Sequence, residues 1–257
     1  MALVRCDFFS EVLEVGTSMT VLLPQASESQ IGVPTSSTGG GEGDGFPVLY
    51  LLHGLSDDST AWQRYTSIER YAAELGLAVV MPQVQRSFYA DEAHGARYWT
   101  FLSEELPSVV ESFFRVSRRR EDTFVAGLSM GGYGALKWAL HQPERFAAAA
   151  SLSGALDLDA ISRDPWRRPL VQRVFDGEVG PLDDLYTLLG EAEIESLPSL
   201  YLGCGTEDHL FAGNERFVDE ATLAGVDVHV DFRPGEHEWG LWDATIRDVL
   251  AWLPLGD

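Results

Sequence analysis

The chain has 257 residues, of which 45% are hydrophobic and 11% are aromatic. This length can bury one sizeable core, and the composition is ordinary for a globular protein. The 18 basic and 40 acidic residues give a formal net charge of −22, which disfavours nucleic acids and anionic membranes as partners because both are polyanions.

The N-terminal residues, MALVRCDFF, lack the charged head, long apolar region and small-residue cleavage site of a secretory signal. No apolar run in the sequence is long enough to cross a bilayer. We therefore expect a cytoplasmic protein, although a secreted form without its signal would look the same. The two cysteines, Cys6 and Cys204, make no disulfide framework or metal cluster, and we expect them to be small buried apolar groups.

The first elements differ from the rest of the chain. Apolar and polar residues alternate through VRCDFFS and EVLEVGTSMTVLLP, which predicts two antiparallel strands at a sheet edge. The following segment, residues 26–46, is rich in Ser, Gly and Thr and can contribute little to a core. It is predicted to be a flexible surface loop.

From residue 46 onward, apolar strands alternate with amphipathic helices. Strands are predicted at 46–53, 77–82, 123–128, 146–152, 199–205 and 226–232, and helices at 66–75, 100–115, 130–141, 213–224 and 240–252. Continuous apolar strands between helices indicate an α/β protein with a mostly parallel sheet buried on both faces. We expect a single domain over residues 1–257, in which residues 159–195 form a cap over the carboxyl edge of the sheet.

The stretch FVAGLSMGGYG contains G-x-S-x-G at Gly127, Ser129 and Gly131. A predicted strand leads into it and a predicted helix leads out, which is the context of a nucleophilic serine on a sharp turn. The small flanking residues let the neighbouring elements approach that turn. The alternative is a serine that only caps the helix. The context favours a nucleophile.

A nucleophilic serine needs a general base. After a serine turn of this kind, the orienting acid and then the histidine base follow the serine along the chain. Four histidines lie downstream. His141 ends the helix that starts at the serine, His229 lies inside a strand, and His209 directly follows the predicted acid. His237 lies on the loop after the last strand, from which an imidazole can reach back over the sheet edge. The sequence predicts His237 as the base.

The acid that orients this base is predicted in the turn after the strand at 199–205. Asp208 is favoured, Glu207 is the rival, and a helix cap is the structural alternative for Asp208. The oxyanion is expected to be bound by the backbone N–H groups of Met130, which follows the nucleophile, and Leu55. His53 precedes the loop that carries Leu55, and it is expected to hold this loop in place by hydrogen bonding.

With these residues placed, the chain resembles α/β-hydrolases of the esterase D group, most closely the bacterial tributyrin esterases. The resemblance rests on LYLLHGLSDDSTAW, TSIERYA, VVMPQV, EELPSVVESFF, VAGLSMGGYGALKWAL, FAAAASLSGALDL, GCGTEDHL and GEHEWGLW. It implies hydrolysis of short-chain carboxylic esters by Ser129, Asp208 and His237, with Leu55 and Met130 as oxyanion donors and no metal or organic cofactor. Residues 26–46 and 159–195 depart from that group, which leaves the substrate range open.

Three alternatives to a simple esterase remain. The group also resembles S-formylglutathione hydrolases and mycolyl acyltransferases, so the acyl group could come from a thioester or pass to a second alcohol. A catalytically inactive binding module on the same fold is the third alternative. The expected partner is a small-molecule ester, and the sequence leaves homo-oligomer formation open. Candidates for the pocket lining are the aromatics Trp62, Phe88, Tyr89, Trp166 and Trp239.

Overall fold

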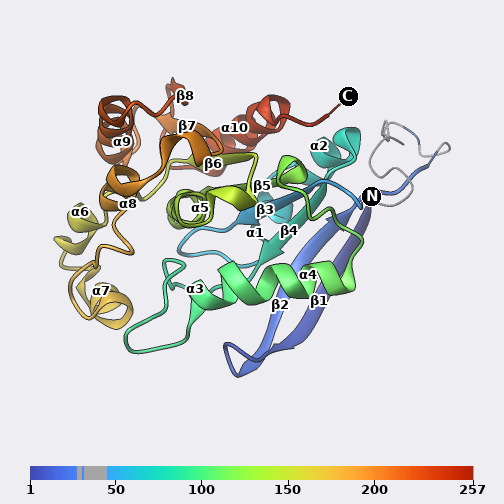
Figure 1. Ribbon diagram of the computed structural model, residues 1–257, viewed down its shortest axis with the longest axis horizontal. Helices are drawn as coiled ribbons and strands as arrows, with labels where there is room; N and C mark the ends of the chain where they lie inside the picture. Colours follow the sequence, from blue (N-terminus) through green and yellow to red (C-terminus); the bar gives the residue numbers. More distant parts are fainter. Residues whose placement is uncertain (28–30, 32–44, 257) are drawn as a thin grey trace.

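The computed structural model describes residues 1–27, 31 and 45–256 (Figure 1). Most of the predicted loop at 26–46 lies outside these residues. The eight strands are β1 (Ala2–Ser10), β2 (Val15–Leu23), β3 (Val48–Leu52), β4 (Ala78–Pro82), β5 (Thr123–Leu128), β6 (Ala148–Leu152), β7 (Ser199–Gly205) and β8 (Val228–Arg233).

The strands form one sheet in the order β1-β2-β4-β3-β5-β6-β7-β8. The antiparallel hairpin of β1 and β2 lies at one edge, as the alternating N-terminal pattern predicted, and β2 also pairs antiparallel with β4. The pairs from β4 through β8 are all parallel. Because parallel strands point the same way, the loops after β3, β5, β6, β7 and β8 all meet at one edge of the sheet.

The helices cover both faces of the sheet. They are α1 (Ala61–Tyr65), α2 (Ile68–Leu75), α3 (Tyr98–Thr100), α4 (Leu106–Phe113), α5 (Met130–His141), α6 (Leu158–Ser162), α7 (Arg168–Phe175), α8 (Leu185–Glu191), α9 (Phe211–Ala224) and α10 (Trp239–Trp252). Residues of α4, α5, α8 and α9 pack in one apolar cluster, and those of α2 and α10 in a second on the opposite face. Successive β3 residues enter alternate clusters, which is why the strand is apolar throughout.

The predicted helix at 100–115 differs most from the sequence pattern. It begins at Tyr98 and contains a π-helical turn, Phe101–Glu105, before α4. Pro107 lacks an N–H and cannot donate to the Ser103 carbonyl, so the regular α-helical ladder is interrupted there. The Arg145 guanidinium lies 3.5 Å from that carbonyl oxygen. Among the described residues, no helix combines the length and apolar character needed to span a bilayer.

Lys137, the sole lysine of the sequence, lies on α5, and its side chain is buried in the protein. Its Nζ donates to the Tyr89 carbonyl at 3.0 Å and to Asp183 Oδ1 at 2.5 Å. Burial lowers the pKa of Lys137, and the Asp183 carboxylate opposes that shift. The ammonium therefore fastens the loop after β4 and the segment before α8 to the helix that follows Ser129. This fixes Phe88 and Tyr89, both with positive φ angles, beside the carboxyl edge.

Candidate active site

The turn between β5 and α5 places Ser129 in a conformation that non-glycine residues rarely adopt, with φ 53° and ψ −117°. A Cβ atom on Gly127 would lie 2.3 Å from the Gly131 carbonyl oxygen, and one on Gly131 would lie 2.4 Å from that of Leu52. Both glycines are therefore required by close approach of backbone to backbone. The G-x-S-x-G pattern has a steric origin here.

The structure brings the three predicted catalytic side chains together from separate loops. The His237 Nε2 atom lies 3.1 Å from Ser129 Oγ, and its Nδ1 atom lies 2.8 Å from Asp208 Oδ2. A hydroxyl, an imidazole and a carboxylate joined in this order can transfer the hydroxyl proton and create a nucleophile. The arrangement suits acyl transfer through a covalent intermediate.

The Asp208 carboxylate is fully buried, and it accepts hydrogen bonds from the His237 ring and, at 2.8 Å, from the Leu210 N–H. Burial alone raises its pKa, but the hydrogen bonds from His237 and Leu210 outweigh that effect and hold the pKa below its usual value. Asp208 is therefore ionised at neutral pH. An ionised carboxylate there fixes the Nδ1–H tautomer of His237 and leaves Nε2 free to accept a proton.

Ring contacts and a neighbouring carboxylate hold the His237 ring in place. The Trp242 ring meets it edge-on with centroids 4.8 Å apart, and the His209 ring contacts it at 4.7 Å. Glu207, the rival acid, accepts the Gly235 N–H at 2.6 Å. Its carboxylate therefore holds the loop that carries His237 instead of contacting the imidazole.

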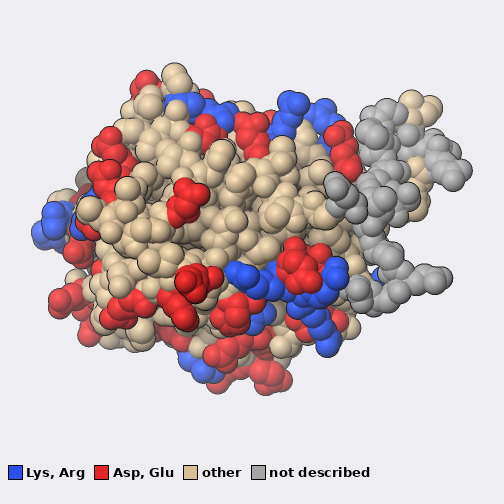
Figure 2. Space-filling view, turned by 45° about the horizontal axis from the view of Figure 1, so that its top comes forward, with Lys and Arg blue, Asp and Glu red and all other residues tan. Residues whose placement is uncertain are grey.

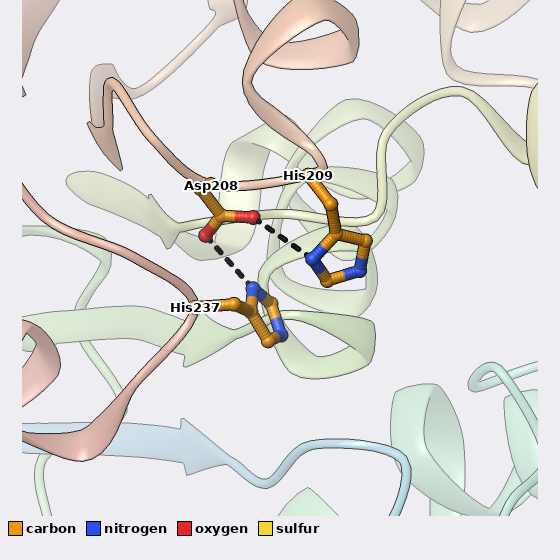
Figure 3. A group of neighbouring side chains, drawn as sticks. All are labelled: Asp208, His209 and His237. Atoms are coloured by element: carbon orange, nitrogen blue, oxygen red, sulfur yellow. Dashed lines mark hydrogen bonds and ion pairs between the residues drawn. The ribbon is translucent and has the colours of Figure 1, made fainter.

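The other downstream histidines occupy different environments. The His141 Nε2 atom lies 2.8 Å from the Leu182 carbonyl oxygen, and the His229 ring stacks on Tyr201 at the sheet edge. His209 is closer to the site than the sequence suggested. Its Nδ1 atom lies 3.4 Å from Asp208 Oδ1, so both imidazoles face one carboxylate (Figure 3). Adjacency to Asp208 in the sequence was a signal that this ring could line the site.

Leu55 and Met130, the expected oxyanion donors, line the same cavity as Ser129. Met130 opens α5, so its N–H has no acceptor within the helix. The loop of Leu55 is held by His53, whose Nδ1 lies 2.8 Å from the Gly54 carbonyl oxygen and whose Nε2 accepts the Val84 N–H at 3.2 Å. The prediction that His53 holds this loop by hydrogen bonding is confirmed.

Two cavities meet at Ser129. The first, of about 520 Å³, has a mainly apolar wall that includes Leu55, Phe88, Met130, Leu156, Ile161 and Leu210, and the charged residues Asp157, Asp164, Arg167 and Arg216 also line it. The second, of about 510 Å³, has charged and aromatic walls that include Asp57, Arg86, Arg167, His237, Glu238 and Trp239. Leu55, Ser129, Arg167 and His209 border both. A substrate can therefore extend in two directions from the serine hydroxyl.

The expectation for the aromatic lining is correct for two of the five residues. Phe88 lines the first cavity and Trp239 the second. Trp62 and Tyr89 are buried in the core, where they donate hydrogen bonds to the carbonyls of Leu52 and His53. Trp166 is 91% exposed and lines neither cavity, so that expectation was wrong. Aromatic composition alone does not separate core residues from lining residues.

The buried His53 gives a testable pH dependence. Burial lowers its pKa from 6.5 to about 4 in the folded protein. The unfolded chain therefore gains a proton at a higher pH than the folded one does, and the contribution of His53 to stability is lost as pH falls from about 6.5 to about 4. This loss lowers the free energy of unfolding by up to about 3 kcal/mol. Urea unfolding of wild type and His53→Gln at pH 7.5 and 4.5 measures it. A variant with the same pH-dependent loss as wild type would contradict the assignment.

Known proteins resemble this chain along nearly all of its length. The Esterase family model, described as "Putative esterase", matches residues 21–253. An acetyl esterase of Caldicellulosiruptor saccharolyticus is 28% identical and covers 98% of both chains. FphF, a fluorophosphonate-binding serine hydrolase of Staphylococcus aureus, has a TM-score of 0.86 at 33% identity and covers 100% of this chain and 99% of its own.

An S-formylglutathione hydrolase, FrmB of Staphylococcus aureus, has a TM-score of 0.83 at 33% identity and covers 98% of both chains. These similarities agree with the eight-stranded, mostly parallel sheet and the serine turn. The chain belongs to the Esterase family and is a serine hydrolase of the α/β-hydrolase fold that acts on ester bonds.

Proposed function

We propose that the protein is a carboxylesterase that hydrolyses esters of short acyl chains through an acyl-enzyme on Ser129. The observation that carries this proposal is the continuous chain of contacts from Ser129 Oγ through the His237 ring to the buried Asp208 carboxylate. The family supports ester hydrolysis in general terms. The acyl range and the placement among tributyrin-type members of the esterase D group are parts of this proposal.

The reaction follows from the geometry. His237 Nε2 takes the Ser129 proton as Oγ attacks the ester carbonyl, and Asp208 stabilises the resulting imidazolium. The N–H groups of Leu55 and Met130 bind the oxyanion, and the N-terminus of α5 adds a favourable dipole. His237 then protonates the departing alcohol. Water attacks the acyl-enzyme by the reverse route and regenerates the Ser129 hydroxyl.

Each of the two cavities holds one part of the substrate. His237 lines the second cavity and is absent from the lining of the first. Because this imidazole protonates the leaving group, the alcohol occupies the second cavity and the acyl chain the first. The apolar part of the acyl cavity wall suits an aliphatic chain, and Asp157, Asp164 and Arg216 also line this cavity. The alcohol cavity has Asp57, Arg86 and Glu238 in its walls. We propose a short aliphatic acyl group on a polar alcohol, with the α6 region acting as a cap over the acyl chain.

A thioester is the second candidate substrate. The charged second cavity could accept a polar, ionised thiol as leaving group. The similar S-formylglutathione hydrolase acts, by its name, on such a thioester. An imidazole on the leaving-group side serves oxygen esters and thioesters by the same acyl-enzyme route. The relative rates on the two substrate classes decide between them.

Removal of the proposed base tests the mechanism. We expect Ser129→Ala and His237→Ala to lower kcat for p-nitrophenyl acetate by at least about 10⁴-fold, because neither variant can form the acyl-enzyme efficiently. His141→Ala and His229→Ala are matched controls, since both rings lie away from the cavities, and their kcat should stay within about twofold of wild type. Comparable losses in His141→Ala would refute the assignment of His237.

A substitution that fills part of the first cavity tests whether that cavity holds the acyl chain. Ala160 lies on α6 and borders this cavity. We expect Ala160→Phe to lower kcat/KM for p-nitrophenyl butyrate and hexanoate by about tenfold while changing that for acetate little, because the bulky ring displaces only the distal methylenes. The exposed Ala251→Phe on α10 is the control.

The wild-type preference should rise from acetyl to butyryl and fall by palmitoyl. If Ala160→Phe instead changes only the preference among alcohols, the two cavities have been assigned the wrong way round. A glutathione thioester in the same substrate series shows whether kcat/KM is higher for thioesters than for oxygen esters.

A further inference from the structure

One carboxylate and two imidazoles form an unusual group at the edge of the site. Figure 3 shows the rings of His209 and His237 approaching the Asp208 carboxylate from the same side, each with a nitrogen directed at a different oxygen. The two Nδ1···O separations are 3.4 Å and 2.8 Å. One donor atom from each residue lies within 4.8 Å of the others.

We propose that Asp208, His209 and His237 form an inhibitory binding site for Zn²⁺ or a similar transition-metal ion. Two imidazole nitrogens and a carboxylate oxygen are a donor set that suits zinc. Tetrahedral ligands at zinc bond lengths stand roughly 3.3 Å apart. The two nitrogen–oxygen separations, 3.4 Å and 2.8 Å, lie on either side of that value, and the three donor atoms lie within 4.8 Å of one another. Movement of the two rings therefore allows a metal to insert between them and the carboxylate.

The position of His209 gives a metal access to the group. Its side chain is 67% exposed, and that of His237 is 23% exposed, while the Asp208 carboxylate is fully covered. A cation can therefore bind His209 first and reach the carboxylate as the rings part. The net charge of −22 attracts cations in general, and Figure 2 shows acidic side chains over one face of the molecule, with basic side chains among them.

Inhibition follows from the tautomer of His237, and this step rests on the proposed function. In the metal-free site, the Nδ1 proton is donated to Asp208 and Nε2 accepts the Ser129 proton. A metal can bind Nδ1 only when that nitrogen has lost its proton and offers a lone pair, so the single proton of the neutral ring then lies on Nε2. The imidazole then donates to Ser129 Oγ and can no longer act as its base. The metal also withdraws the Asp208 carboxylate from the ring.

The variant His209→Gln tests whether zinc binds at this site, because it removes one of the proposed imidazole ligands. Gln keeps the size and polarity of the side chain but lacks an imidazole ligand. The control is His94→Gln, because His94 pairs with Asp176 at 2.9 Å in an exposed His–Asp contact formed by other loops. Each variant is compared with its own metal-free activity, so a change in basal rate does not enter the result.

Isothermal titration of ZnCl₂ into the wild-type protein should show one site, with affinity at least about tenfold weaker in His209→Gln and unchanged in His94→Gln. Zinc should inhibit p-nitrophenyl acetate hydrolysis with a constant that matches this affinity, EDTA should restore the rate, and Mg²⁺ should have little effect because it prefers oxygen ligands. Equal inhibition of wild type and His209→Gln, or an active enzyme that neither binds nor responds to zinc, would overturn the site. Zinc binding that depends on His209 in a protein without esterase activity would instead leave the site intact and refute the proposed function.

Discussion

The close approach of β5, α5 and the end of β3 is the constraint on which the site depends. Gly127 and Gly131 let these backbones pack at distances that any Cβ would prevent, and this packing forces the strained turn at Ser129. Backbone hydrogen bonds hold this turn, since the Ser129 N–H donates to the Leu152 carbonyl and the Ser129 carbonyl accepts from the Ala155 N–H. The serine hydroxyl therefore projects at the carboxyl edge before any substrate binds.

Parallel topology then brings distant residues to this hydroxyl. The loops after β7 and β8 begin at the same edge, so Asp208 and His237 meet although they lie 29 positions apart in the sequence. Electrostatics completes the arrangement, because a buried, ionised carboxylate orders the imidazole and the imidazole lowers the pKa of the carboxylate. The same exposed edge and the same carboxylate explain why a second imidazole can compete for Asp208.

Much of this arrangement could be predicted from the sequence. Strands β5 and β7 and helix α5 have the predicted bounds, because β5 ends and α5 begins at the serine turn, β7 ends at Gly205, and α5 ends shortly before Pro143. Ser129, Asp208 and His237 could be named from chain order and loop position. The π-helical turn before α4, the exposure of Trp166 and the contact of His209 with Asp208 were not predicted. These depend on ring orientation and tertiary packing, which periodicity does not report. Glu207 and Asp208 could be ranked by residue type, but only the loop geometry shows that Glu207 binds the Gly235 N–H.

The central claim is that Ser129 carries the acyl group during turnover with His237 as its base. Rapid acid quenching of the enzyme with p-nitrophenyl acetate, followed by intact-mass measurement and peptide mapping, tests this directly. The account predicts one added acetyl group, located on Ser129 and absent when His237 is replaced by alanine. An acetyl group on another residue during turnover, or labelling of Ser129 at an undiminished rate without His237, would contradict it.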